Sequence, residues 1–212
     1  MSSRSTEKQK ELPIAKANSS EAQKLADLAA IIQDFRTIIQ TCSRLKKLLD
    51  ENSKDHILIE SLWVSALIKY ARCFATGKRF GLTKDIYQNL QGEPLKVHQF
   101  YIDLRNKHIA HSVNPFEQME VGFILSPINN SEKKIVGVST LAMRHIVSDK
   151  KGIQQLGILS KIAHDKICSI AKETEQKVLV EGQKIPIDEL YKISQPRLVA
   201  PGPDLANKPR VN

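Results

Sequence analysis

The spacing of apolar residues limits this chain to a mainly helical fold. From residue 20 to residue 49, apolar side chains recur at intervals of three and four positions, which places them on one face of an α-helix. Ser20 suits the N-cap of this helix, and Glu21 lies in its first turn. Such a stripe is typical of a helix packed into a bundle, and a short coiled-coil seam is the alternative. Its members are Leu25, Leu28, Ile32, Phe35, Ile39, Cys42, Leu45, Leu48 and Leu49.

The same periodicity predicts further helices along the chain. Pro94 suits the first turn of one of them, and Pro115 restricts Asn114 to extended conformations, so this helix is expected to end near Ser112. Asp149 opens the last helix, which is long. After the first helix, the expected helical segments are residues 56–76, 82–91, 94–112 and 149–180.

The sequence changes character between residues 118 and 143. Two segments there, VGFILSP and KKIVGVSTLAM, are rich in β-branched and aromatic residues, and Asn129-Asn130 lies between them. This pattern predicts a β-hairpin over about residues 118–143. Because a two-stranded ribbon is marginally stable alone, we expect it to pack on the helices or on another subunit.

Length and composition are typical of one globular domain with tails. The chain has 212 residues, of which 41% are hydrophobic and 26% are charged. We expect a mainly α fold, an up-and-down helical bundle over residues 19–182 with the hairpin insert. A flexible N-terminal tail (1–18) and a Pro-rich C-terminal tail (183–212) are expected to flank it. Its apolar runs fall short of the roughly 18–20 residues that span a bilayer, and its N-terminus lacks the apolar core of a secretory signal. We therefore expect a cytoplasmic protein without a membrane partner.

Isolated cysteines and histidines give weaker signals. The cysteines are widely separated and odd in number, so neither a disulfide framework nor a CxxC metal site is expected. They are interpreted as small buried hydrophobes: Cys42, Cys73 and Cys168. Four histidines are interpreted as surface or capping groups: His56, His98, His145 and His164. Glycine-rich nucleotide-cradle motifs are missing from the sequence, and no cofactor is expected.

Basic residues are concentrated in the middle of the chain. The formal net charge is +9, and residues 69–107 hold eight basic side chains against three acidic ones. One interpretation is a set of solvated helix faces. The other is a phosphate-attracting surface, for which the candidates are Arg72, Lys78, Arg79 and Lys107.

The segment RNKHIAH, residues 105–111, carries groups suited to phosphodiester chemistry. A histidine with a near-neutral pKa can take or give a proton, and a forked guanidinium can hold a phosphate and stabilise its developing charge. On an ideal α-helix, Arg105 and His111 are about 120° apart. They share a pocket only if the helix loosens near its end, or if another element or subunit completes the site.

This segment resembles the Arg-x(4–6)-His motif of the HEPN superfamily, helical domains found in toxins, defence proteins and RNA-processing factors. Arg105 and His111 match its two anchors, and Asn106 matches the polar residue after the arginine. The resemblance implies a metal-independent endoribonuclease whose site forms across a homodimer. It implies His111 as acid/base, Arg105 as phosphate and transition-state stabiliser, and Asn106 as a positioning group. His108 has no role in the motif, although it can supply a second hydrogen bond. A toxin or phage-defence role with an antitoxin partner follows from the same resemblance.

Other interpretations of the motif stay open. A non-catalytic helical module would use RNKHIAH only to bind RNA, a nucleotide or a protein partner. In a purely structural protein, His108 and His111 would be satisfied core histidines. A metal site at these two histidines lacks a third ligand at a recognisable spacing, so none is expected.

Overall fold

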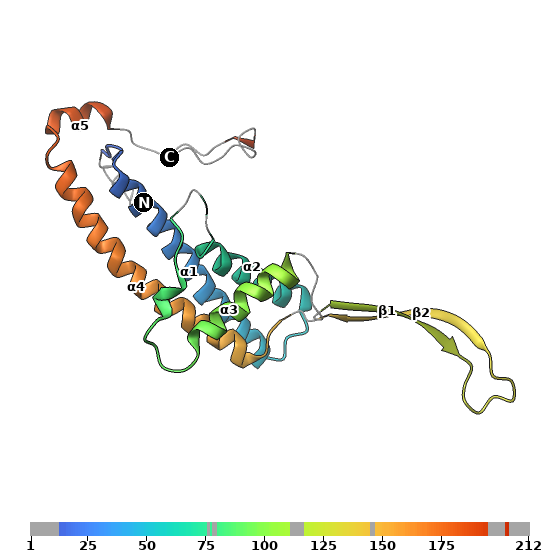
Figure 1. The fold of residues 1–212 in the computed structure, drawn as a ribbon. Helices are drawn as coiled ribbons and strands as arrows, with labels where there is room; N and C mark the ends of the chain where they lie inside the picture. The colour runs from blue at the N-terminus through green and yellow to red at the C-terminus, as the bar shows by residue number, and fades with distance from the viewer. Residues whose placement is uncertain are drawn as a thin grey trace, which may run out of the picture. The chain divides into compact units, whose positions relative to one another are not determined.

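The structure is mainly helical and carries one two-stranded antiparallel sheet in its described part (Figure 1). This computed structural model describes residues 13–75, 77, 80–110, 117–144, 147–194 and 202–203. The helices are α1 (Ser20–Asp50), α2 (His56–Cys73), α3 (Pro94–Leu104), α4 (Lys150–Gly182) and α5 (Ile187–Ile193). A 3₁₀ turn, η1 (Lys84–Tyr87), precedes α3, and a π-helical turn, η2 (Arg105–Ile109), follows it. The strands are β1 (Glu117–Leu125) and β2 (Ile135–Arg144).

Short side chains cap the helices near the residues that the sequence indicates. The hydroxyl of Ser19 accepts from the amide of Ala22 at 3.1 Å, so the cap of α1 is Ser19 and the expectation of Ser20 is wrong by one residue. Asp149 accepts from the amide of Gly152 at 2.7 Å, which confirms the predicted start of α4. The expected helix over residues 82–91 is only the 3₁₀ turn η1.

Internal contacts divide the chain into two units, Ala29–Cys168 and Met1–Leu28 with Ser169–Asn212. In the first unit, tyrosines bridge helices from within the core. The hydroxyl of Tyr101 in α3 donates to the carbonyl of Gly152 in α4 at 2.6 Å. Gly157 of α4 lies against Cys42 of α1, where an added Cβ would be 3.4 Å from the cysteine Cβ. Glycine there allows the two helices to approach closely.

In the second unit, α5 corrects a prediction. The sequence predicts a Pro-rich tail over residues 183–212, whereas residues 187–193 form a helix. A β-bridge joins Ala15 to Ser194, and Lys177 pairs with Glu21 at 3.9 Å. Within the described residues, no helix has the length and apolar character to cross a bilayer.

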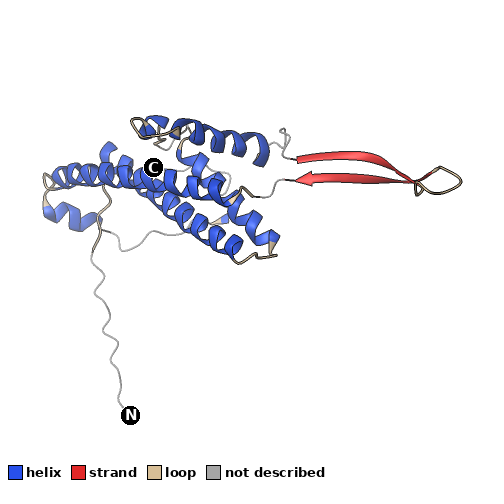
Figure 2. Ribbon diagram, turned by 90° about the horizontal axis from the view of Figure 1, so that it is seen from below, coloured by secondary structure: helices blue, strands red, loops and turns tan. Residues whose placement is uncertain are grey.

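The predicted hairpin is confirmed, and its register is regular from Glu117↔Arg144 to Ile124↔Gly137 (Figure 2). A bulge between Ile124 and Leu125 then shifts the pairing to Leu125↔Ile135. Between residues 118 and 143, no side chain is buried. The ribbon therefore does not bury side chains against the helices, as one of the two expectations required.

A buried carboxylate joins α1 to α2. Asp34 is 3% exposed and accepts from the guanidinium of Arg72 through both carboxylate oxygens, one of them 2.7 Å from Nε. The ammonium of Lys69 lies 3.9 Å from the same carboxylate. Two cations of α2 thus balance one buried acid of α1, as buried charges require.

We expect Asp34→Ala to lower the free energy of unfolding by about 2 kcal/mol, because a buried charge-assisted bond is lost and two cations lose their shared partner. Urea unfolding followed by circular dichroism measures the change. Asp165→Ala is the control, since Asp165 forms an exposed pair with Lys161, and exposed pairs contribute little to stability. Equal losses in the two variants would contradict the structural role of Asp34.

Candidate functional site

The motif segment forms a π-helical turn rather than the end of an α-helix. The amide of Ala110 donates to the carbonyl of Arg105, five residues earlier, at 3.0 Å. The α-helix that was expected through Ser112 therefore ends at Leu104, and the wider turn η2 continues it to Ile109. Turns of this kind are frequent at functional sites. The helix loosens at Arg105, as a shared pocket with His111 would require, while His111 lies outside the described residues.

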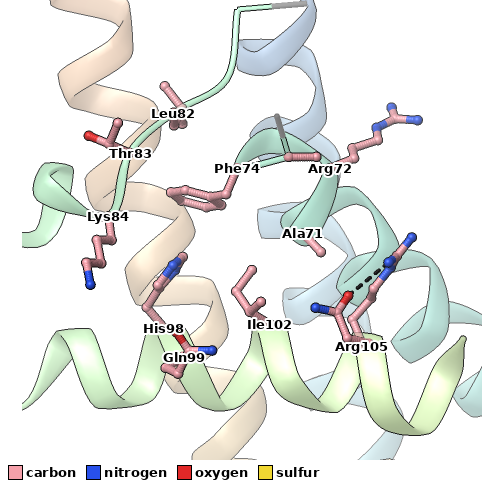
Figure 3. A pocket seen from close by; sticks show the side chains of 12 residues that line it. Ala71, Arg72, Phe74, Leu82, Thr83, Lys84, His98, Gln99, Ile102 and Arg105 are labelled. Carbon is pink, nitrogen blue, oxygen red and sulfur yellow. Dashed lines mark hydrogen bonds between the residues drawn. The ribbon is translucent and has the colours of Figure 1, made fainter. Parts of the chain in front are cut away.

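Arg105 and Asn106 lie in the wall of a cavity of about 530 Å³ (Figure 3). One wall comes from a single face of α3 and η2, with residues at intervals of three and four positions. The opposite wall comes from the end of α2 and the segment that leads into η1. The lining residues are Ala71, Arg72, Phe74, Ala75, Leu82, Thr83, Lys84, His98, Gln99, Ile102, Arg105 and Asn106.

A hydrogen bond orients the guanidinium of Arg105. Its Nη1 donates to Oδ1 of Asn106 at 2.9 Å, the bond drawn as a dashed line in Figure 3. A guanidinium has five N–H groups in a fixed fork, so this bond engages only one of them. Asn106 thus holds one edge of the fork, and its role as a positioning group in a reaction stays a prediction.

The two other cations of the cavity wall have different surroundings. Arg72 bonds the buried Asp34, and this hydrogen bond raises the pKa of the Arg72 guanidinium. Its charge is therefore largely balanced within the protein. Lys84 comes from η1 and lines the cavity beside His98 and Phe74 (Figure 3). Lys84 was not among the predicted RNA-binding residues, although the sequence places it in the basic segment.

His98 is a cavity residue that the sequence interpretation missed. It is 5% exposed, so its assignment as a surface or capping group is wrong. Its Nδ1 lies 2.9 Å from the hydroxyl of Tyr70, and its ring centroid lies 4.5 Å from that of Phe74. The available signal was spacing, because His98 precedes Arg105 by seven residues, two helical turns on one face.

A chain of hydroxyl groups fixes the tautomer of His98. Tyr87 donates its only proton to the carbonyl of Leu159 at 3.3 Å, and Tyr70 donates its own to Tyr87 at 3.1 Å. Tyr70 then has only an acceptor to offer, so Nδ1 of His98 carries the hydrogen and Nε2 is an acceptor. Burial lowers the pKa of His98 to about 4, and the charge of Lys84 adds to this shift. The imidazole is neutral at physiological pH.

Two further predicted site residues that the structure describes lie outside the cavity wall. His108 is buried but does not line the cavity. Lys107 is exposed and also lies outside the lining residues. Three predicted residues lie outside the described part of the chain: Lys78, Arg79 and His111. In the described ranges, no three His, Cys, Asp or Glu side chains are grouped as metal ligands.

Chemically, the cavity combines one oriented guanidinium, one ammonium, a neutral imidazole acceptor and an apolar wall. This set suits a phosphate with an attached planar or sugar group. No protein-family model, curated protein or solved structure matches the chain. The HEPN resemblance therefore depends on the motif residues alone.

We expect acid to destabilise the protein partly through His98. The unfolded chain binds a proton at this residue below its ordinary pKa of 6.5, whereas the folded chain binds it only near pH 4. The contribution is fully present above pH 6.5 and is lost as the pH falls from 6.5 toward 4. The variant His98→Asn keeps an N–H donor for Tyr70 but has no group that titrates at this position. We therefore expect it not to lose this contribution to stability as the pH falls.

Urea unfolding of both proteins across this pH range measures the effect. The stability difference between them is expected to change by roughly 2 kcal/mol. Parallel pH profiles for the wild type and His98→Asn would contradict a neutral buried imidazole.

Proposed function

We propose that the chain is a metal-independent endoribonuclease of HEPN type that binds RNA at the Arg105 cavity. The observation that carries this proposal is the π-helical turn η2, which sets Arg105 and its partner Asn106 in a cavity with Lys84 and His98. A phosphate in this cavity meets a bidentate donor at Arg105 and a point charge at Lys84. The neutral Nε2 of His98 and the apolar wall suit the attached nucleoside.

The proposed reaction is a transesterification at phosphorus. His111 accepts the proton of a ribose 2′-OH, and the 2′ oxygen attacks the adjacent phosphate. The bond from phosphorus to the 5′ oxygen breaks, and a proton passes to that leaving oxygen. The products are a 2′,3′-cyclic phosphate and a 5′-hydroxyl end. Arg105 stabilises the negative charge that develops on the phosphate oxygens.

The same resemblance supports a biological role and an assembly. We propose a helical bundle of HEPN type that acts as a homodimer, as a toxin or phage-defence component restrained by an antitoxin protein. The central concentration of basic residues supports an RNA substrate, since the +9 net charge attracts polyanions.

A second candidate is a non-catalytic module that binds RNA or a nucleotide in this cavity. His98 favours it, because its Nδ1 is bonded to Tyr70 and burial lowers its pKa to about 4. Such an imidazole is suited to accept a hydrogen bond and poorly suited to shuttle protons at neutral pH. Under the first proposal, proton transfer therefore depends on His111 and not on His98.

We expect the purified chain to cleave RNA in the presence of EDTA and to leave 2′,3′-cyclic phosphate ends. His111→Ala is expected to reduce the cleavage rate by about a hundredfold to ten-thousandfold, since it removes acid/base catalysis. Arg105→Ala is expected to reduce it by at least about a hundredfold, and Arg105→Lys restores little because the fork is lost. Gel analysis of end-labelled RNA measures the rates.

Arg44→Ala is the matched control, because Arg44 is an exposed arginine of α1 that does not line the cavity. Cleavage that survives both His111→Ala and Arg105→Ala would overturn the assignment. Loss of wild-type cleavage in EDTA would indicate a metal-dependent reaction instead. Tight, salt-sensitive binding without products would favour the non-catalytic module.

We expect Lys84→Ala to weaken RNA binding and to lower its salt dependence. One phosphate contact contributes roughly 0.7–1 to the slope of log affinity against log salt concentration. Fluorescence anisotropy with labelled single-stranded RNA measures the slope for the wild type, Lys84→Ala and the exposed control Lys47→Ala. A slope that is unchanged in Lys84→Ala would mean that Lys84 does not contact phosphate.

A further inference from the structure

The register of the hairpin gives it one apolar face. Partners across an antiparallel ladder lie on the same face, and successive residues of a strand alternate between faces. One face therefore collects Met119, Val121, Phe123 and Leu125 of β1 with Ile135, Val138, Thr140 and Ala142 of β2. We call these residues the apolar face. The other face is mixed, with Gln118, Glu120, Gly122 and Ile124 of β1 and Gly137, Ser139, Leu141 and Met143 of β2.

The apolar face is exposed along its whole length. Met119, Val121 and Phe123 expose 77%, 74% and 69% of their surface. Leu125, Val138 and Ile135 expose 67%, 61% and 60% of theirs. Contiguous exposed apolar patches of this kind mark interaction surfaces.

We propose that the apolar face is the contact surface of a homodimer, in which the hairpins of two copies pack face to face. A two-fold contact uses the same patch on both copies, so each apolar residue meets an apolar residue. A specific interface of standard size buries roughly 800 Å² on each partner, and the apolar face is expected to form the centre of such a contact. Packing against a second copy also supplies the apolar partner surface that a two-stranded ribbon needs for stability.

Charge favours a second copy over other partners. From residue 118 to residue 143 the chain holds two acidic and two basic side chains, so the hairpin is neutral. These are Glu120 on the mixed face and Glu132, Lys133 and Lys134 between the strands. A polyanion or an anionic membrane would find no cation on the apolar face. Two copies of the chain, each with a net charge of +9, repel each other through their basic surfaces. The neutral hairpins can approach without this repulsion.

Paired substitutions on the two faces test this surface in the full chain. We expect the wild type to sediment as a dimer, and Val121→Glu to weaken dimerisation at least about a hundredfold, because the interface would bury an unpaired charge. Met143→Glu is the control, since Met143 is 57% exposed on the mixed face opposite the neutral Gln118, and this variant should leave the dimer unchanged. Sedimentation equilibrium over a wide concentration range measures both constants.

A second measurement does not depend on a charged substitution. With Cys168, a half-buried cysteine, changed to serine, Val138→Cys should cross-link two chains through a bifunctional thiol reagent and Leu141→Cys should not. A monomeric wild type, or equal behaviour of the two faces in both measurements, would overturn the proposal. Flotation with neutral lipid vesicles that is lost in Val121→Glu, with a monomer in solution, would overturn it in favour of a membrane surface. None of these readouts depends on RNA cleavage.

Discussion

The position of the candidate site depends on a hydrogen-bonded chain from the carbonyl of Leu159 to the imidazole of His98. Tyr87 and Tyr70 form its two middle links, so the chain joins α4, η1, α2 and α3. Burial raises the pKa of both tyrosines, which keeps their hydroxyl groups protonated and the direction of every bond fixed. Buried polar networks hold one arrangement when all members are satisfied. Because His98 lies two turns before Arg105, this network also fixes the part of α3 that leads to the Arg105 guanidinium.

The two arginines of the cavity differ in whether an acidic side chain of the protein balances their charge. Arg72 completes an ion pair between α1 and α2, and its charge is largely balanced within the protein. Arg105 bonds a neutral amide, so its full charge remains for a ligand. A count of basic residues along the sequence treats these arginines alike. The structure separates a cation that supports the fold from one that is available to a phosphate.

Periodicity predicts α1, α2, α4 and the hairpin closely, because each of these patterns repeats over many residues. The start of α3 at Pro94 and the strands of the hairpin follow from local rules. The π-helical turn does not, since five residues are too few to distinguish bonds to the fourth residue from bonds to the fifth. The burial of His98 could not be predicted for another reason, because its partner Tyr70 is 28 residues away in the sequence. The residues that surround a single histidine in the sequence do not indicate a contact of this kind.

The candidate site and the hairpin are linked by chain length. Only residues 111–116 separate the motif turn, with Ala110 at its end, from β1, and a segment of six residues spans at most about 20 Å. Hairpins that pair in a dimer would therefore tether both motif turns to one contact. A hairpin contact uses no residue of the cavity, so Val121→Glu is expected to weaken self-association while the residues of each cavity stay unchanged. Because the resemblance implies a site that forms across a homodimer, RNA cleavage is expected to fall together with self-association in this variant, although Arg105 and Asn106 are intact.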